Sequence, residues 1–159
     1  MVWKRWSFPR ILIIGLIFTQ LTGISLFSQS VQNLEDVGNA ELGSRLNQHL
    51  RSGDLYQAAP VLIEFRKRML SVELPKRNLE KVSYYIGLGF LNGYSQNQNK
   101  ALLQEAAKEF QHYMDTFPRG QDIHYVVINR VECHRGLSEC AEAIPLMEAL
   151  LDATKPYLR

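Results

Sequence analysis

From Leu34 onward, apolar residues recur every three or four positions, with polar and charged residues between them. That spacing is typical of amphipathic helices. The stretch that most resembles a strand, Tyr125-Val-Val-Ile128, lies inside a window with the same helical periodicity. We therefore expect an all-α domain over residues 34–159.

The helices are expected in three pairs, because turn residues divide the pattern. The pairs cover about residues 34–75, 76–120 and 121–157. In the first pair, Gly53 can end one helix and Asp54 can begin the next, and Pro75 closes the unit. Pro60 and Pro145 fall about a turn inside their helices, where we expect a local bend and not a break.

The first 28 residues predict a secretory signal peptide. A basic segment precedes the apolar run from Ile11 to Phe18, and small residues follow it. We place the cleavage after Ser28 or Ser30 and a polar linker at residues 29–33. The alternative is a retained anchor, because the uncharged stretch from Ile11 to Leu34 is long enough to span a bilayer.

The charge balance changes once this leader is set apart. The whole chain has 18 Lys+Arg and 16 Asp+Glu, but residues 1–28 hold three basic and no acidic residues, so the remainder is slightly acidic. The sequence therefore makes no case for nucleic-acid binding. Arg66-Lys67-Arg68 is the basic cluster of the helical part. It either suits the negative end of its helix dipole or meets an acidic partner or an anionic head-group.

The second pair carries the most specific pattern, which consists of Ile86, Gly87, Phe90, Ala106, Phe110 and Pro118. Phe110 lies four residues after Ala106, and Pro118 follows eight residues later. A small residue lets two antiparallel helices approach, an aromatic residue fills the space between them, and a proline ends the second helix. The pattern resembles the tetratricopeptide repeat (TPR), which runs W-x2-L-G-x2-Y, then A-x3-F, then P.

The other two pairs carry the signature in weaker form. Ala58 and Leu62 take its small and large positions in the first pair, and Ala143 and Met147 take them in the third. The segment 139–147 also matches the segment 54–62 in its acid, alanine and proline positions. With its leader, the chain resembles exported envelope proteins of this family, of the BamD-like outer-membrane assembly type or the Tol-Pal coordinating type. It departs from the first type by having no lipid-acceptor cysteine after the leader, and from the second by having no obvious N-terminal coiled coil.

The resemblance implies a right-handed α-solenoid of about three helical hairpins, whose concave face grips a peptide or another protein. On the first helix of the second pair, we expect Lys81, Tyr84, Tyr85 and Leu88 to bind the partner.

The second pair is longer than the repeat. Gly87 and Ala106 lie nineteen positions apart, where the repeat pattern has about twelve. We place the seven extra residues in a polar loop at 94–100, which either serves binding or is a tolerated surface loop.

The end of the third pair is expected to expose apolar side chains, namely Leu146, Leu150 and Leu151. No polar capping helix follows them in this sequence. A partner, self-association or a longer natural chain would have to cover that surface.

No catalytic, cofactor-binding or metal-binding motif is found in the sequence, so we do not expect an enzyme or a cofactor. The four histidines share no ligand spacing and are expected at the surface or in the groove: His49, His112, His124 and His134. Cys133 and Cys140 flank the turn of the third pair. They form either a disulfide, in an oxidising compartment, or two reduced and packed thiols.

Together these features predict an exported scaffold that binds a protein or peptide in the bacterial periplasm or cell envelope. The alternative is an assembly factor anchored in the inner membrane by a retained leader. The membrane is met only through the leader, and only if the leader is uncleaved.

Overall fold

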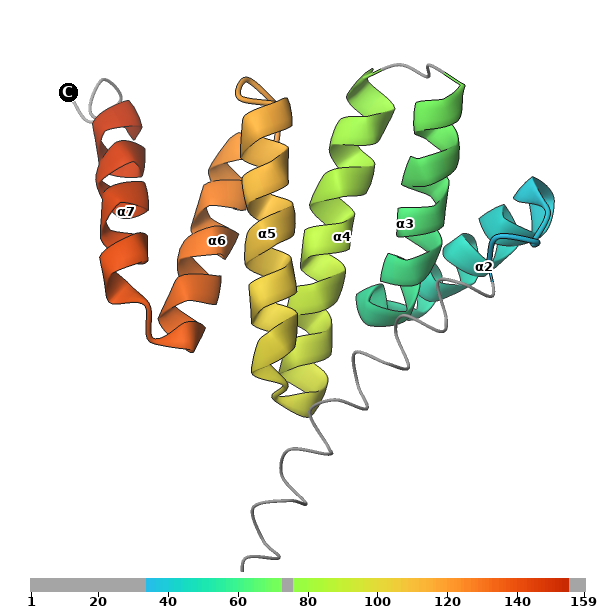
Figure 1. The fold of residues 1–159 in the computed structure, drawn as a ribbon, viewed down its shortest axis with the longest axis horizontal. Coiled ribbons are helices and arrows are strands. Elements are labelled where there is room, and N and C mark those ends of the chain that lie inside the picture. The colour runs from blue at the N-terminus through green and yellow to red at the C-terminus, as the bar shows by residue number, and fades with distance from the viewer. Residues whose placement is uncertain (1–33, 73–75, 155–159) are drawn as a thin grey trace, which may run out of the picture.

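The computed structural model describes residues 34–72 and 76–154 (Figure 1). Within these ranges the chain forms six α-helices and no strand, which are α2 (Asn39–Ser52), α3 (Leu55–Ser71), α4 (Lys76–Asn97), α5 (Lys100–Thr116), α6 (Ile123–Leu137) and α7 (Cys140–Thr154). The expected all-α class is confirmed. The leader, its linker and the boundary at Pro75 lie outside the described residues.

The helices stand side by side in the order of the sequence, with α2 at one end of the row and α7 at the other (Figure 1). Each helix packs chiefly on the helices before and after it in the chain. Because successive helices reverse direction, α2/α3, α4/α5 and α6/α7 form three hairpins. Helices two places apart, such as α4 and α6, therefore run the same way.

The three hairpins turn on two residues each, and the first of the two lies in the left-handed region of backbone space: Gly53 at φ 73°, Gln98 at φ 57° and Ser138 at φ 65°. The second residue begins the next helix. The Asp54 carboxylate accepts a hydrogen bond from the Gln57 amide at 3.1 Å, and the Asn99 side chain accepts one from the Ala101 amide at 3.0 Å. The expected helix end at Gly53 and helix start at Asp54 are therefore confirmed.

The expected polar loop at residues 94–100 is wrong. α4 continues through Asn97, and only Gln98 and Asn99 separate it from α5. At about 3.6 residues per turn, seven extra residues amount to about two turns of helix. Shared between α4 and α5, they lengthen the hairpin by about one turn on each side and leave the same faces in contact.

α4 approaches α3 closely because two of its residues are glycines. A Cβ atom at Gly89 would lie 2.6 Å from the Cβ of Ala59 and 2.6 Å from the carbonyl oxygen of Leu55. A Cβ atom at Gly93 would overlap the ring of Tyr56. Any larger side chain at these positions would push the two helices apart.

α4 meets α5 through a third glycine. A Cβ atom at Gly87 would overlap the ring of Phe110, which is fully buried. The ring fills the space that the glycine leaves. Around it lies the main core, whose buried members are Ala58, Leu62, Ile86, Phe90, Leu102, Leu103, Ala106, Phe110, Tyr113, Val126 and Cys133.

Most residues of the repeat signature are buried in the structure. The two exceptions are Pro118, which follows the end of α5, and Met147, whose side chain is 51% exposed on α7. Ala143 is buried, as its counterpart Ala58 is. Pro60 and Pro145 both lie inside helices that continue past them, so neither breaks its helix.

The apolar surface at the end of the row differs from the expected one. Leu146 and Leu150 are half-buried, because they share the side of α7 that holds Ala143 and faces α6. Ile144 and Met147 are exposed instead, and Leu151 is exposed as expected.

Arg66 of the basic cluster joins α3 to α5. Its guanidinium group donates to both carboxylate oxygens of Glu109, at 2.5 and 2.9 Å, and both side chains are mostly buried. A bidentate pair of this kind fixes orientation as well as distance. It links two helices that are not neighbours in the row.

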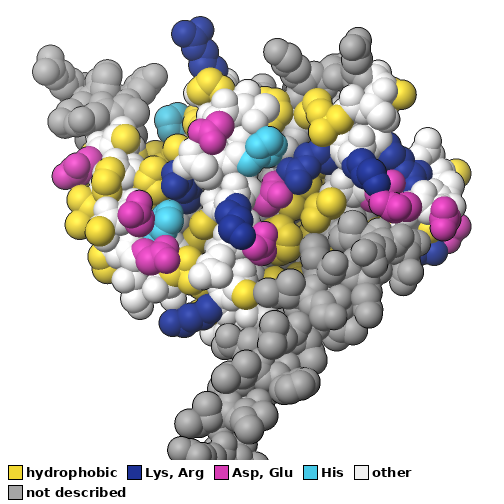
Figure 2. Space-filling view, in the orientation of Figure 1, with side chains coloured by type: hydrophobic (Ala, Val, Ile, Leu, Met, Phe, Trp, Pro, Cys, Tyr) yellow, Lys and Arg dark blue, Asp and Glu magenta, His cyan; other side chains and the backbone are white. Residues whose placement is uncertain are grey.

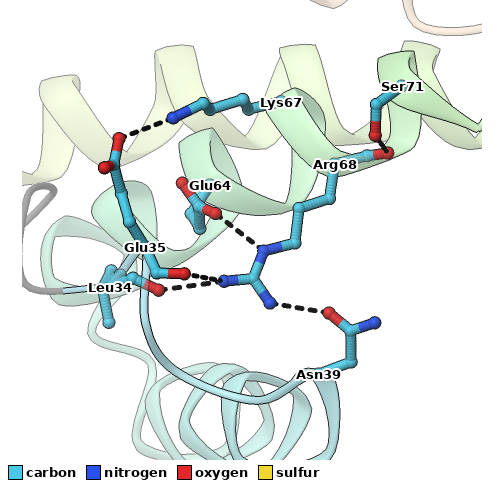
Figure 3. Close-up of polar contacts among 7 residues, drawn as sticks. All are labelled: Leu34, Glu35, Asn39, Glu64, Lys67, Arg68 and Ser71. Atoms are coloured by element: carbon cyan, nitrogen blue, oxygen red, sulfur yellow. Dashed lines mark hydrogen bonds and ion pairs between the residues drawn. The ribbon is translucent and has the colours of Figure 1, made fainter.

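Arg68 fastens the start of the domain to α3 (Figure 3). It donates to Glu64, to Asn39, and to the backbone carbonyls of Leu34 and Glu35. The neighbouring Lys67 pairs with the Glu35 carboxylate at 2.5 Å. All three cations of the cluster are thus bound by groups of this chain, a role that the sequence analysis did not include.

We expect Gly89→Ala to lower the free energy of unfolding by about 1–3 kcal/mol, because the backbone oxygen of Leu55 cannot move aside for a methyl group. Gly43→Ala in α2 is the matched control, since a Cβ atom there meets nothing within 4 Å. It should raise stability by about 1 kcal/mol through helix propensity alone. Urea unfolding followed by circular dichroism measures the change in the free energy of unfolding for both variants. Changes of the same sign would contradict the close approach of α4 to α3 at Gly89.

We expect Arg68→Ala to cost about 3–5 kcal/mol, because it leaves the almost fully buried Glu64 carboxylate without its cation. Lys67→Ala removes the adjacent cation from an exposed pair and should have a much smaller effect. Urea unfolding of the two variants and the parent gives the comparison. Equal losses would show that Arg68 stabilises no more than a surface cation does.

Candidate functional site

A groove lies between α4 and α6, the two helices that flank α5 on one side of the row. It contains a cavity of about 490 Å³. α4 contributes Leu91, Tyr94 and Ser95 to the walls, and α6 contributes Asn129, Glu132, Arg135 and Gly136. Leu103 of α5 lines it between the two helices.

Two of the residues that line the cavity bring α5 and α6 into close contact. A Cβ atom at Gly136 would lie 2.7 Å from Leu103 Cδ1, so the glycine lets α6 lie directly on α5. Near this contact, Arg135 and Glu132 form an ion pair at 2.5 Å and are largely exposed. The cavity therefore has an apolar base and a rim that carries both signs of charge.

An aromatic cluster continues the groove toward the start of α6. The Tyr84 ring packs against Tyr85 at 5.8 Å and against Phe110 and Tyr113 at 6.4 Å, measured between ring centroids. Burial raises the pKa of Tyr84, while a hydrogen bond with the Asn129 side chain partly opposes the shift. Tyr84 is therefore a neutral, fixed side chain that links α4 to α6.

Three large side chains on these two helices are exposed. Tyr85 is 40% exposed on α4, and Tyr125 and Ile128 are 61% and 44% exposed on α6. A tyrosine offers a large apolar ring and a polar hydroxyl at little conformational cost, which suits it to binding a partner.

Tyr113 and Glu80 hold the start of α6 in place beside α4. The Tyr113 hydroxyl donates to Glu80 Oε1 at 2.6 Å, and the Gln121 amide donates to the same oxygen. Burial, followed by the contact with Glu80, raises the pKa of Tyr113 well above its ordinary value. The groove thus has a rigid border where the chain passes from α5 to α6.

The four residues expected to bind a partner lie along α4, but only part of that set belongs to the groove. Tyr85 and Lys81 are exposed, whereas Tyr84 and Leu88 are half-buried against the core. The cavity lies further along the helix, and α6 supplies half of it, which the sequence analysis missed. A signal was present in the spacing, because Tyr84, Leu88, Leu91 and Ser95 follow one face of α4, and Tyr125, Asn129, Glu132 and Gly136 repeat the same spacing on α6.

His134 corrects the expectation that every histidine lies at the surface or in the groove. It is buried on α6, and its Nδ1 lies 2.9 Å from Glu139 Oε2 across the turn to α7. The contact closes the third hairpin. His112 and His124 are exposed, and His49 is half-exposed.

Cys133 and Cys140 are unbridged in the structure. Cys133 is fully buried in the core, whereas Cys140 is exposed at the first position of α7. Burial, with a smaller contribution from Glu132, raises the pKa of the Cys133 thiol to about 12.

Among the residues that the structure describes, no three His, Cys, Asp or Glu side chains are grouped so as to hold a metal ion. No helix within residues 34–72 and 76–154 has the length and hydropathy needed to cross a membrane. Comparisons with protein-family models, with curated proteins and with solved structures found no match to this chain.

We expect one thiol of the reduced, folded protein to react with Ellman's reagent at pH 8. That thiol is Cys140, since only the thiolate is reactive and Cys133 stays protonated and buried at this pH. Cys140→Ser should abolish the reaction until denaturant exposes Cys133. Reaction of folded Cys140→Ser at the rate of the parent would show that Cys133 is accessible and would contradict this expectation. Protein isolated without reductant that shows no reactive thiol even when unfolded would show that the two cysteines are bridged.

Proposed function

We propose that this protein is an exported scaffold of TPR-like helical hairpins, and that the groove between α4 and α6 binds a peptide or a segment of another protein. The observation that carries the proposal is the pair of matching stripes on α4 and α6. They run in the same direction and enclose a cavity with an apolar base and polar walls. Its volume lies in the range of ligand-binding clefts in proteins.

The arrangement of the row supports a binding scaffold. Helical hairpins that contact only their neighbours build extended, curved surfaces and not a closed reaction centre. Helices of the same direction then line one side of the row and leave grooves between them. A right-handed superhelix with a concave binding face belongs to this proposal.

The length of the hairpins limits how close the TPR resemblance is. The left-handed turn residues of successive hairpins, Gly53, Gln98 and Ser138, are 45 and 40 residues apart. A TPR repeats every 34 residues or about that, whereas HEAT and armadillo repeats take about 40–47. The helix pairing and the small-residue contacts support a TPR-like unit, with each helix longer than in the repeat itself.

Export rests on residues 1–28 and places the groove in the periplasm or cell envelope. The uncharged stretch from Ile11 to Leu34 favours the second form of the proposal, in which the leader is retained as a membrane anchor. N-terminal sequencing of protein taken from the producing cells separates the two forms. A start near residue 29 supports the released scaffold, and an intact N-terminus in the membrane fraction supports the anchored one.

We expect a peptide selected from a random displayed library against the protein to lose at least tenfold in affinity for Tyr125→Ala, because an exposed aromatic beside the groove acts as a binding hot spot. Leu70→Ala is the matched control, since Leu70 is 62% exposed against 61% for Tyr125 but lies at the far end of α3. The affinity of the peptide for Leu70→Ala should differ from its affinity for the parent by less than about twofold, as is usual for residues outside a hot spot. Fluorescence anisotropy with the labelled peptide measures both.

Two results would contradict the proposal that the groove between α4 and α6 is a binding site. One is a selection that yields no specific peptide. The other is a peptide whose affinity falls equally for both variants, because the peptide would then bind elsewhere or bind exposed apolar side chains non-specifically.

A further inference from the structure

Most polar side chains that line the groove between α4 and α6 are already bonded within the chain. The Ser95 hydroxyl donates to the backbone carbonyl one turn earlier at 3.2 Å. Arg135 pairs with Glu132 at 2.5 Å. The Asn129 side chain is hydrogen-bonded to Tyr84. The groove therefore offers few free donors and acceptors to the backbone of an occupant.

An extended peptide needs such groups. Its N–H and C=O groups would lose water on entering the groove, and a buried backbone group without a partner costs free energy comparable to a lost hydrogen bond. A helix bonds these groups internally and presents side chains to its surroundings along its length. The bonded state of the groove's polar side chains therefore favours a helical occupant over an extended one.

The length and width of the groove also suit a helix. The matching stripes run from Tyr84 to Ser95 on α4 and from Tyr125 to Gly136 on α6. Each stripe is about 16 Å long, which equals about three turns of a helix. α4 and α6 do not pack along each other, because α5 stands between them. Their axes therefore lie farther apart than the roughly 8–10 Å of directly packed helices, and an occupant can contact both.

The groove has an apolar base and one strongly exposed aromatic side chain. Figure 2 shows the side of the row on which α5 stands in front of its neighbours, and basic and acidic side chains are spread over it. Because α5 fills the gap between α4 and α6 there, the groove opens on the other side. Leu91 and Leu103 line its cavity, and Tyr125 is 61% exposed. An occupant thus needs an apolar face toward the groove and a polar face toward water.

The spacing along α6 predicts where the apolar anchors of the occupant lie. Glu132, which lines the cavity, follows Tyr125 by seven residues, or about two turns. A side chain that packs on Tyr125 and another that enters the cavity over Leu91 and Leu103 are therefore also about two turns apart. In a helix such anchors stand at positions i and i+7, with i+3 or i+4 between them on the same face.

We propose that the segment bound in this groove is an amphipathic helix of about three turns, with large apolar side chains at i, i+4 and i+7. This inference rests on the proposed function of the groove and specifies its occupant. The apolar face of the helix packs on the cavity and on Tyr125. The polar face stays in water, and the backbone makes no hydrogen bond to the groove.

Peptides selected from a random displayed library, against the protein in the form that cells produce, test the proposal. Only peptides that lose affinity for Tyr125→Ala are carried forward, because these bind the groove. At a central position where alanine leaves the affinity unchanged, glycine should weaken binding about fivefold and proline at least about a hundredfold. These are the losses that the helix propensities of the two residues give. Fluorescence anisotropy measures the affinities.

The first residue of the same peptide provides the matched control. Proline there should change the affinity by less than about threefold, because the first turn of a helix tolerates it. A Tyr125-dependent peptide that tolerates proline at its centre overturns the helical occupant and leaves the groove as a site for an extended segment. If no selected peptide depends on Tyr125, the proposed function of the groove fails, and the helical occupant fails with it.

Discussion

The structure depends on how closely α4 can approach its two neighbours. Gly89 and Gly93 let α3 lie against one side, and Gly87 lets the Phe110 ring lie against another. Each glycine in a helix costs roughly 1 kcal/mol of intrinsic propensity relative to alanine. That cost is offset by the burial of Tyr56, Ala59 and Phe110, which only a helix without side chains at those points allows. The first hairpin and the second are joined through this contact.

Ion pairs link the helices that the glycine contacts bring close together. Close packing brings α3 and α5 near enough for Arg66 to reach Glu109 past the intervening helix. Arg68 ties the residues before α2 to α3, and its neighbour Lys67 binds Glu35. The basic cluster Arg66-Lys67-Arg68 therefore forms its ion pairs and hydrogen bonds within the chain and stabilises the packing of the helices. The surface that remains exposed is aromatic and amide along α4 and α6 and apolar along the edge of α7.

The sequence predicted the helices, the turn at Gly53-Asp54 and the small and large residues of the repeat signature, most of which are buried, because each follows from local chemistry or from periodicity. It failed at residues 94–100, where a polar composition suggested a loop. Residues 94–97 extend α4 instead and Lys100 begins α5, since an added turn preserves the contacts of both neighbours and a loop does not. His134 and the groove were missed for another reason. Both depend on side chains from two helices. The pattern of apolar and polar residues in a single helix does not show which other helix packs against it.

The equivalence of the three turns links the interior of the row to its ends. Gly53, Gln98 and Ser138 all lie at positive φ at the same place in a two-residue turn, so the three hairpins are built alike. A position buried in one hairpin then has a counterpart in the next, and its exposure there depends on whether a helix follows. Ala59 is covered by α4, and its counterpart Ile144 is not covered by any helix that the structure describes. The exposed face of α7 is thus the counterpart of the face of α3 on which α4 packs.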